Sequence, residues 1–231
     1  MLKQDLTLRN PLRLLGKSTD AILTEGGFGA VLARAGVGKT AFTVQIAMNS
    51  LLNNQNVLHI SLNDPVDKVT LWYKEVFALL AAQYNTVQIN QLWETIAPHR
   101  FIMTFRVDRF TVPKLEERLV DLSAQNIFIP KMMVIDGIPF NKKVHSQLLE
   151  FQTLAHRLKV HVWFTVQTHR HEQPGPDGMP PQLSNLSELF DVVIQLQPQG
   201  NEIHIQALKG NDTNTKEIPL RLDPSTMLIQ T

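Results

Sequence analysis

The chain has 231 residues, of which 43% are hydrophobic and 19% are charged. This size and composition favour a single globular domain with one sizeable core. The sequence contains no cysteine, which excludes disulfide bonds and thiolate metal sites and suits a reducing cytoplasm. The formal net charge is +1, so nucleic acid or an anionic lipid surface would have to be recognised by a local patch.

Neither a membrane span nor a secretory signal is expected. The longest uninterrupted apolar run, Val76 to Ala82, is far shorter than the roughly 18 to 20 residues that a membrane span needs. The first residues lack the apolar stretch of a secretory signal. We therefore expect a cytoplasmic protein with no membrane partner, with residues 1–25 as an N-terminal lead-in and residues 26–231 as one domain.

From Phe28 onward, short apolar runs alternate with helical patterns. The runs are typical of strands buried on both faces, and they read FGAVLA, NVLHISL, RFIMTF, KMMVID and VHVWFTV. Helices are expected over residues 39–54, from 64 to about 83, from 111 onward and from about 143 to 159. This alternation predicts right-handed βαβ units, and hence an α/β fold with a mostly parallel central sheet flanked by helices.

The last third of the chain has a different pattern. Residues 171–185 are rich in Pro and Gly and predict a long loop. Four short strand-like runs follow, separated by turn residues: FDVVIQLQ, NEIHIQALK, KEIPLRLD and TMLIQ. Closely spaced strands of this kind predict antiparallel pairs at the C-terminal edge of the sheet.

The stretch ARAGVGKTA, residues 33–41, reads as a phosphate-binding loop between the first strand and the first helix. The N–H groups of such a turn and of the following helix start point at a polyphosphate. Lys39 is expected to reach the β- and γ-phosphates of ATP, and the Thr40 hydroxyl is expected to ligate Mg²⁺. The predicted nucleotide-binding residues are Arg34, Ala35, Gly36, Val37, Gly38, Lys39, Thr40 and Ala41.

Ala33 stands where the pattern G-x-x-x-x-G-K-[ST] has its first glycine. It lies at the expected end of the strand, before the tight part of the loop, and a methyl group is the smallest side chain that can replace glycine there. We therefore expect Ala33 to be tolerated. The alternative is an ordinary strand-to-helix turn, but the buried type of strand before the motif and the helix after it favour a phosphate loop.

These stretches resemble the RecA superfamily of P-loop ATPases, particularly its RecA/RadA, DnaB-type helicase and KaiC-like branches. The resemblance covers about residues 26–230 and includes MMVID as the Walker B strand, VWFTVQTHR and the closing strands. It implies a RecA-like P-loop fold, ATP and Mg²⁺ as ligands, and homo-oligomers. It also implies that Asp136 holds Mg²⁺ through water and that Gln167 senses the γ-phosphate. The alternatives are a plain turn after a strand for Asp136 and a plain hydrogen-bonding residue for Gln167.

Two positions depart from the family's pattern. Many members have a Glu after the second strand that polarises the attacking water, whereas this chain has Asn63, and an amide cannot accept a proton at neutral pH. Asp64 could replace that Glu, or it could cap the helix that follows Pro65. Many relatives have Lys-x-Arg where this chain has Lys209 and Asn211. Lys209 could act in trans on the nucleotide of a neighbouring subunit, or it could be a solvated lysine before a turn.

Three functions follow from these residues. The first is an ATP- and Mg²⁺-binding switch or assembly factor with slow or partner-dependent hydrolysis. The second is an active ATPase in DNA recombination, replication or repair, although the loop of residues 171–185 has no aromatic residue for base stacking, so nucleic acid is weakly supported as a partner. The third is a non-enzymatic interaction domain that retains the fold. Lys39 and Asp136 argue against the third function, and Asn63 and Asn211 argue against the second.

Overall fold

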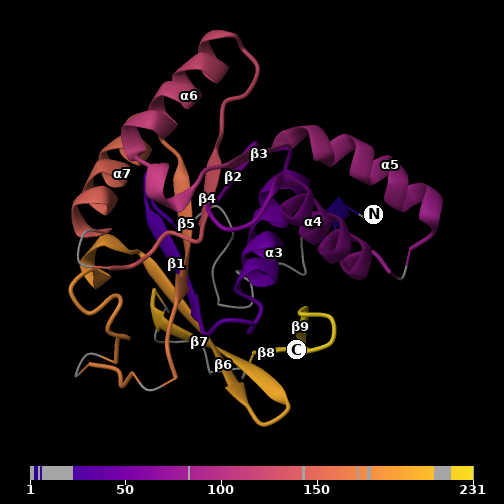
Figure 1. Cartoon of the computed structure of the whole chain (residues 1–231). Coiled ribbons are helices and arrows are strands. Elements are labelled where there is room, and N and C mark those ends of the chain that lie inside the picture. Colours follow the sequence, from indigo (N-terminus) through magenta and orange to yellow (C-terminus); the bar gives the residue numbers. More distant parts are fainter. Residues whose placement is uncertain are drawn as a thin grey trace.

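The computed structural model describes residues 3, 4, 6, 23–82, 84–141, 144–170, 172–175, 178–210 and 220–230. In this part of the chain, nine strands form one sheet in the order β3-β2-β4-β5-β1-β6-β7-β8-β9 (Figure 1). The strands are β1 (Phe28–Ala33), β2 (Val57–Ser61), β3 (Arg100–Thr104), β4 (Met132–Asp136), β5 (His161–Gln167), β6 (Val192–Gln199), β7 (Glu202–Lys209), β8 (Arg221–Leu222) and β9 (Ile229–Gln230).

The sheet is mostly parallel. Strands β3, β2, β4, β5, β1 and β6 pair in parallel, whereas β7, β8 and β9 continue the sheet as antiparallel strands at the C-terminal edge. The predicted α/β architecture with antiparallel edge strands is confirmed. Because parallel strands end at the same edge of a sheet, the residues that follow β1, β2, β4 and β5 lie along one carboxyl edge.

Helices cover both faces of the sheet (Figure 1). They are α3 (Lys39–Leu52), α4 (Val66–Leu80), α5 (Thr86–Ile96), α6 (Val112–Ala124) and α7 (Val144–Leu158), with 3₁₀ turns at Ala97–His99, Val107–Arg109 and Ser187–Leu189. Successive residues of a strand face opposite sides of the sheet. Accordingly, Val31 of β1 packs in the cluster under α3 and α4, and its neighbours Ala30 and Leu32 pack in the cluster under α6 and α7.

Helix α5 is the one described α-helix that the sequence patterns above do not predict. The side chain of Asn85 accepts a hydrogen bond from the N–H of Gln88 at 2.9 Å and so caps its start. Its apolar residues Ile89, Leu92 and Trp93 have helical spacing but are only partly buried against the core. The helical spacing and the Asn85 cap were therefore the signals available for this helix.

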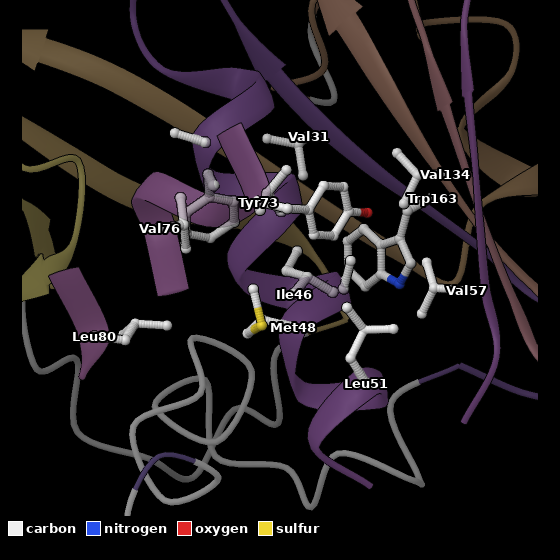
Figure 2. Close-up of a cluster of buried hydrophobic side chains, with 14 of the residues drawn as sticks. Val31, Ile46, Met48, Leu51, Val57, Tyr73, Val76, Leu80, Val134 and Trp163 are labelled. Carbon is white, nitrogen blue, oxygen red and sulfur yellow. The ribbon is translucent and has the colours of Figure 1, made fainter. Parts of the chain in front are cut away.

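The core beneath α3 and α4 holds the start of α3 in place. Figure 2 shows Tyr73 of α4 and Trp163 of β5 among aliphatic side chains of the sheet and of α3. The Tyr73 hydroxyl lies 3.1 Å from Nδ1 of His59, and burial lowers the pKa of His59 to about 4, so this pair is uncharged at neutral pH. Because α3 is fixed between the sheet and α4, the side chains at its first turn have a well-defined position.

Among the described residues, no helix has both the length and the apolar character needed to cross a membrane. Most of the predicted lead-in, residues 1–25, lies outside the described residues, as does part of the third C-terminal run, KEIPLRLD. The described end of that run forms β8, and the run TMLIQ contributes β9.

Candidate functional site

The predicted phosphate loop connects β1 to α3. Two of its residues, Gly36 (φ 78°) and Gly38 (φ 97°), have left-handed backbone conformations, which glycine adopts without steric cost. Gly38 is the cap residue of α3, and in the described part of the chain no side-chain cap accepts a hydrogen bond from the first turn of this helix. Its first N–H groups are therefore available to an anion, as the loop prediction requires.

Ala33 is the last residue of β1, where the sequence pattern placed it. Its side chain is 1% exposed, it lies in register with Gln167 of β5, and its carbonyl accepts a hydrogen bond from the N–H of Thr168 at 3.0 Å. The methyl group therefore lies inside the sheet and not in the turn. This position agrees with the expectation that alanine is tolerated.

The Lys39 side chain folds back across the loop. Its Nζ donates to the carbonyl oxygens of Ala33 at 3.0 Å and of Arg34 at 3.1 Å. Burial lowers the pKa of Lys39, and the negative charge of Asp136 opposes this shift. An anion bound at the loop would replace two neutral acceptors with a charged one, which is a stronger partner for an ammonium group.

Asp136 ends β4 and meets two hydroxyl groups from other elements. Its Oδ2 accepts a hydrogen bond from Oγ1 of Thr40 at 3.0 Å, and its Oδ1 accepts one from Oγ1 of Thr165 at 2.6 Å. The carboxylate is half-buried. Carboxylate and hydroxyl oxygens are the ligands that Mg²⁺ prefers, so Thr40 and Asp136 form a suitable pair for that ion.

Thr165 belongs to this site, although the sequence reasoning did not single it out. Its hydroxyl donates to Asp136 and also accepts from the N–H of Gly137 at 3.2 Å, which fixes the carboxylate from the β5 side. The signal available in the sequence was a hydroxyl residue inside an apolar run, two positions before Gln167. Residues two apart share a face of a strand.

Gln167, the predicted sensor of the γ-phosphate, is the last residue of β5. It is exposed and lies level with Ala33 at the start of the loop. The register of β1 and β5 therefore places it beside the loop. Its role as a sensor stays a prediction.

Asn63 lies beside the turn that follows Asp136. The N–H of Leu62 donates to the carbonyl of Asp136 at 2.9 Å, so the chain leaving β2 runs along the end of β4. A Cβ added to Gly137 would lie 2.3 Å from Nδ2 of Asn63, and the Asn63 amide therefore packs on the glycine backbone. Asn63 thus lies next to the candidate metal ligand Asp136.

Asp64 is engaged with the helix that follows it. Its Oδ1 forms an ion pair with Nζ of Lys68 at 2.8 Å, and its N–H donates to Oγ of Ser61 at 2.9 Å. Helix α4 begins at Val66 with Pro65 in the cap position and without a side-chain cap. The cap role considered for Asp64 is therefore wrong, because its carboxylate pairs with a lysine one turn into the helix. A catalytic role stays a prediction.

Lys209 lies away from the phosphate loop of its own chain. It ends β7 in register with Val193 of β6, and Val193 is level with Ala30, near the amino end of β1. Its Nζ donates to the carbonyl of Ser187 at 2.8 Å. An action in trans on a neighbouring subunit stays a prediction, and Asn211 lies outside the described residues.

The C-terminal strands bring Met227 against the phosphate loop. A Cβ added to Gly38 would lie 2.8 Å from the sulfur atom of Met227. Nε2 of Gln45, within α3, donates to the carbonyl of Met227 at 2.6 Å. These contacts join residues about 180 positions apart, and the sequence patterns contain no signal for them.

The carboxyl edge of the sheet therefore brings Lys39, Thr40, Asp136 and Thr165 together. Within the described residues, Asp64 is paired elsewhere and Lys209 lies toward the opposite edge. Comparison of the chain with protein-family models and with curated proteins gave no match. The functional interpretation consequently rests on the residues, distances and burial at this edge.

Proposed function

We propose that the chain is a RecA-like P-loop protein that binds ATP with Mg²⁺. In this proposal it acts as a nucleotide-dependent switch or assembly factor with slow or partner-dependent hydrolysis, and homo-oligomers are its expected form. The observation that carries the proposal is the 3.0 Å hydrogen bond between Thr40 Oγ1 and Asp136 Oδ2. It joins the first turn of α3 to the end of β4, and an ordinary strand-to-helix turn does not need a carboxylate there.

The loop supplies the groups that a triphosphate requires. The N–H groups of Gly36 and of the run from Gly38 to Ala41 offer donors at a helix start, where the helix dipole favours negative charge. The N–H of Val37 instead donates to the carbonyl of Arg34. A Cβ added to Gly36 would meet no atom within 4 Å, so the loop is open to a ligand on that side. Lys39 would exchange the carbonyls of Ala33 and Arg34 for phosphate oxygens.

Thr40 and Asp136 would hold Mg²⁺, directly or through water. When bound there, the ion neutralises charge on the β- and γ-phosphates. Thr165 holds the second carboxylate oxygen of Asp136 at 2.6 Å, so it orients the carboxylate toward Thr40. A pre-oriented carboxylate loses less conformational entropy on metal binding.

The same edge supports slow hydrolysis. An amide at position 63 cannot take a proton from water at neutral pH. The carboxylate of Asp64 is paired with Lys68, so its use as a base would require breaking that ion pair. These contacts favour a switch over an active ATPase of DNA recombination, replication or repair.

Calorimetric titration with ATP and Mg²⁺ tests the proposal. The unmodified protein should bind ATP, and Lys39→Ala should weaken binding about a thousandfold, because two or more charge-assisted hydrogen bonds of about 2 kcal/mol each are lost. Lys74→Ala removes an exposed lysine of α4 and should leave the affinity unchanged.

Turnover with and without single-stranded DNA then separates the two ATP-dependent functions. Slow turnover that DNA does not accelerate agrees with the switch. Absence of ATP binding by the unmodified protein would overturn the proposal, and fast turnover that collapses in Asp64→Asn would favour the active ATPase.

A further inference from the structure

A cavity of about 310 Å³ lies beside the phosphate loop. Its wall comes from three segments: the start of the loop, the residues that follow β5 and the end of β6. The polar side chains used below are those of Arg34, Thr168, Arg170, Glu172, Gln195 and Gln197. Residues 36–41 do not line it, so it adjoins the proposed nucleotide site and shares only Arg34 with the predicted nucleotide-binding residues. Its volume lies at the lower end of the range for small-molecule pockets.

Two arginines line this cavity and have no partner among the described residues. Arg34 is half-buried and Arg170 is exposed, and within the described residues neither guanidinium has an ion pair or a hydrogen bond. By contrast, the guanidinium groups of Arg106, Arg157 and Arg221 each pair with a carboxylate on the surface. A partly buried cation without a counter-charge is costly, and the guanidinium fork matches carboxylate and phosphate oxygens.

The other polar groups of the cavity suit an anion that also carries hydroxyl groups. Nε2 of Gln197 donates to Oε1 of Gln195 at 2.8 Å, which leaves the amide nitrogen of Gln195 as a donor and the amide oxygen of Gln197 as an acceptor. Glu172 contributes one negative charge. Its Oε2 already accepts hydrogen bonds from the N–H of His169 and from Nε2 of Gln182. Among the described lining residues, two guanidinium groups against one carboxylate give the cavity a positive charge.

We propose that this cavity binds a compact organic anion, whose carboxylate or phosphate oxygens lie on Arg34 and Arg170 and whose hydroxyl groups lie on Gln195 and Gln197. The ligand is a small organic acid or a phosphate monoester.

Arg34 also links the cavity to the phosphate loop. Its carbonyl accepts one of the hydrogen bonds of Lys39, and Thr168, another residue of the cavity wall, donates its N–H to Ala33, the second acceptor of Lys39. An anion on the Arg34 guanidinium offsets a positive charge close to the triphosphate site. Occupancy of the cavity therefore weakens ATP binding, and ATP weakens occupancy by the same factor. This coupling rests on the proposed function, whereas occupancy does not.

Nuclear magnetic resonance on the full-length, ¹⁵N-labelled Lys39→Ala protein tests occupancy without interference from the phosphate loop. Citrate and glycerol 3-phosphate serve as probes, each up to about 10 mM, in the absence of ATP. At least one probe should shift the side-chain signals of Arg34, Gln195 and Gln197 in a saturable way, and the better probe identifies the ligand class.

Arg34→Gln in the same background should weaken binding at least about tenfold, because a charge-assisted bidentate pair is lost. Arg118→Gln removes an exposed arginine of α6 and should change nothing. The proposal is supported if the three side chains show saturable shifts and if the binding weakens in Arg34→Gln but not in Arg118→Gln. It is overturned if neither probe gives saturable shifts, if Arg34→Gln binds as well as its parent, or if only a single-stranded oligonucleotide shifts these signals.

The two proposals can fail separately. If the unmodified protein binds no ATP but the probes fill the cavity, the nucleotide proposal fails and the anion cavity stands. If ATP binds and the probes do not, only the cavity proposal fails. In the unmodified protein, a saturating concentration of the better probe should weaken ATP binding by a few-fold. An unchanged ATP affinity would contradict the proposed coupling between the two sites but not the binding of the anion in the cavity.

Discussion

Two neighbouring regions of the carboxyl edge use their polar groups in opposite ways. In the region that we propose to bind ATP, here called the binding region, the side chains of Thr40 and Thr165 converge on the carboxylate of Asp136 from a helix and a strand. In the hydrolysis region, which follows β2, Asn63 packs on the backbone of Gly137 and Asp64 pairs with Lys68. Since the two regions come from different strands, the groups proposed to bind ATP can be present in a chain that has no general base for the attacking water.

For the comparison of the two regions, the largest expected effect comes from placing a carboxylate in the hydrolysis region. Asn63→Glu should raise ATP turnover about a hundredfold, because a positioned general base contributes at least about that factor. The Asn63 side chain is exposed and adjoins Gly137, so a longer side chain has room near the metal ligands. Steady-state phosphate release measures the effect.

Asn63→Gln is the matched control, since it has the length of Glu without the charge. It should leave turnover at the level of the unmodified protein. Equal rates in the Glu and Gln variants would show that position 63 does not face the attacking water. The residue at position 63 would then not explain slow hydrolysis.

A smaller effect is expected from Asp136, the proposed metal ligand of the binding region. Asp136→Asn should weaken ATP binding about tenfold in the presence of Mg²⁺, because the amide is a poorer ligand than the carboxylate. In EDTA the affinity should stay equal or rise, since the variant lacks a negative charge near the phosphates. Titration calorimetry under both conditions measures this difference.

Asp121→Asn, at an exposed position of α6, controls for the loss of one negative charge. It should behave as the unmodified protein with and without Mg²⁺. An equal loss of affinity in Asp136→Asn under both conditions would mean that Asp136 supports the loop structurally and does not hold a metal ion.

The sequence predicted those features of the two regions that depend on neighbouring residues, but not those that depend on contacts between residues far apart in the chain. Local apolar runs and loop residues predicted three elements of the site. These are the strand that ends at Ala33, the start of the helix at Lys39 and the strand that ends at Asp136. Thr165 and Met227 were not predicted, since their roles depend on strand register and on contacts across the fold. Propensity and periodicity describe one segment at a time and do not specify which distant segment will lie beside it.

The cap role of Asp64 shows a different limit. An Asp before a proline favours capping, yet here a lysine four residues later offers an ion pair at 2.8 Å. Local preference therefore described the start of α4 but not the partner of Asp64. The choice between two nearby partners of similar strength depends on side-chain geometry, which the sequence does not specify.

Thr165→Val tests whether the orientation of Asp136 matters. Valine has nearly the same shape as threonine but cannot donate to Asp136 Oδ1, so the apparent affinity for Mg²⁺ in the presence of ATP should fall about fivefold, or about 1 kcal/mol. Thr153→Val, on the exposed side of α7, is the control. An unchanged Mg²⁺ affinity at unchanged thermal stability would remove Thr165 from the binding region.

The smallest expected effect is a pH dependence of ATP binding that originates at Lys39. Burial lowers the pKa of this ammonium in the free protein, whereas a bound triphosphate raises it again, because opposite charge favours the protonated form. Binding is then strongest where Lys39 is protonated in the free protein and weakens as the pH rises through its lowered pKa.

From about pH 8, where ATP is fully ionised, towards about pH 10, we expect the ATP affinity to fall progressively. Lys39→Arg is the sharpest comparison, because a guanidinium stays protonated throughout this range and its weaker binding should not change with pH. Calorimetry in two buffers of different ionisation enthalpy should also detect proton uptake on ATP binding at the alkaline end by the unmodified protein only. If the ATP affinity fell equally with pH in the unmodified protein and in Lys39→Arg, the titrating group would be another residue. Lys39 would then stay protonated over this pH range.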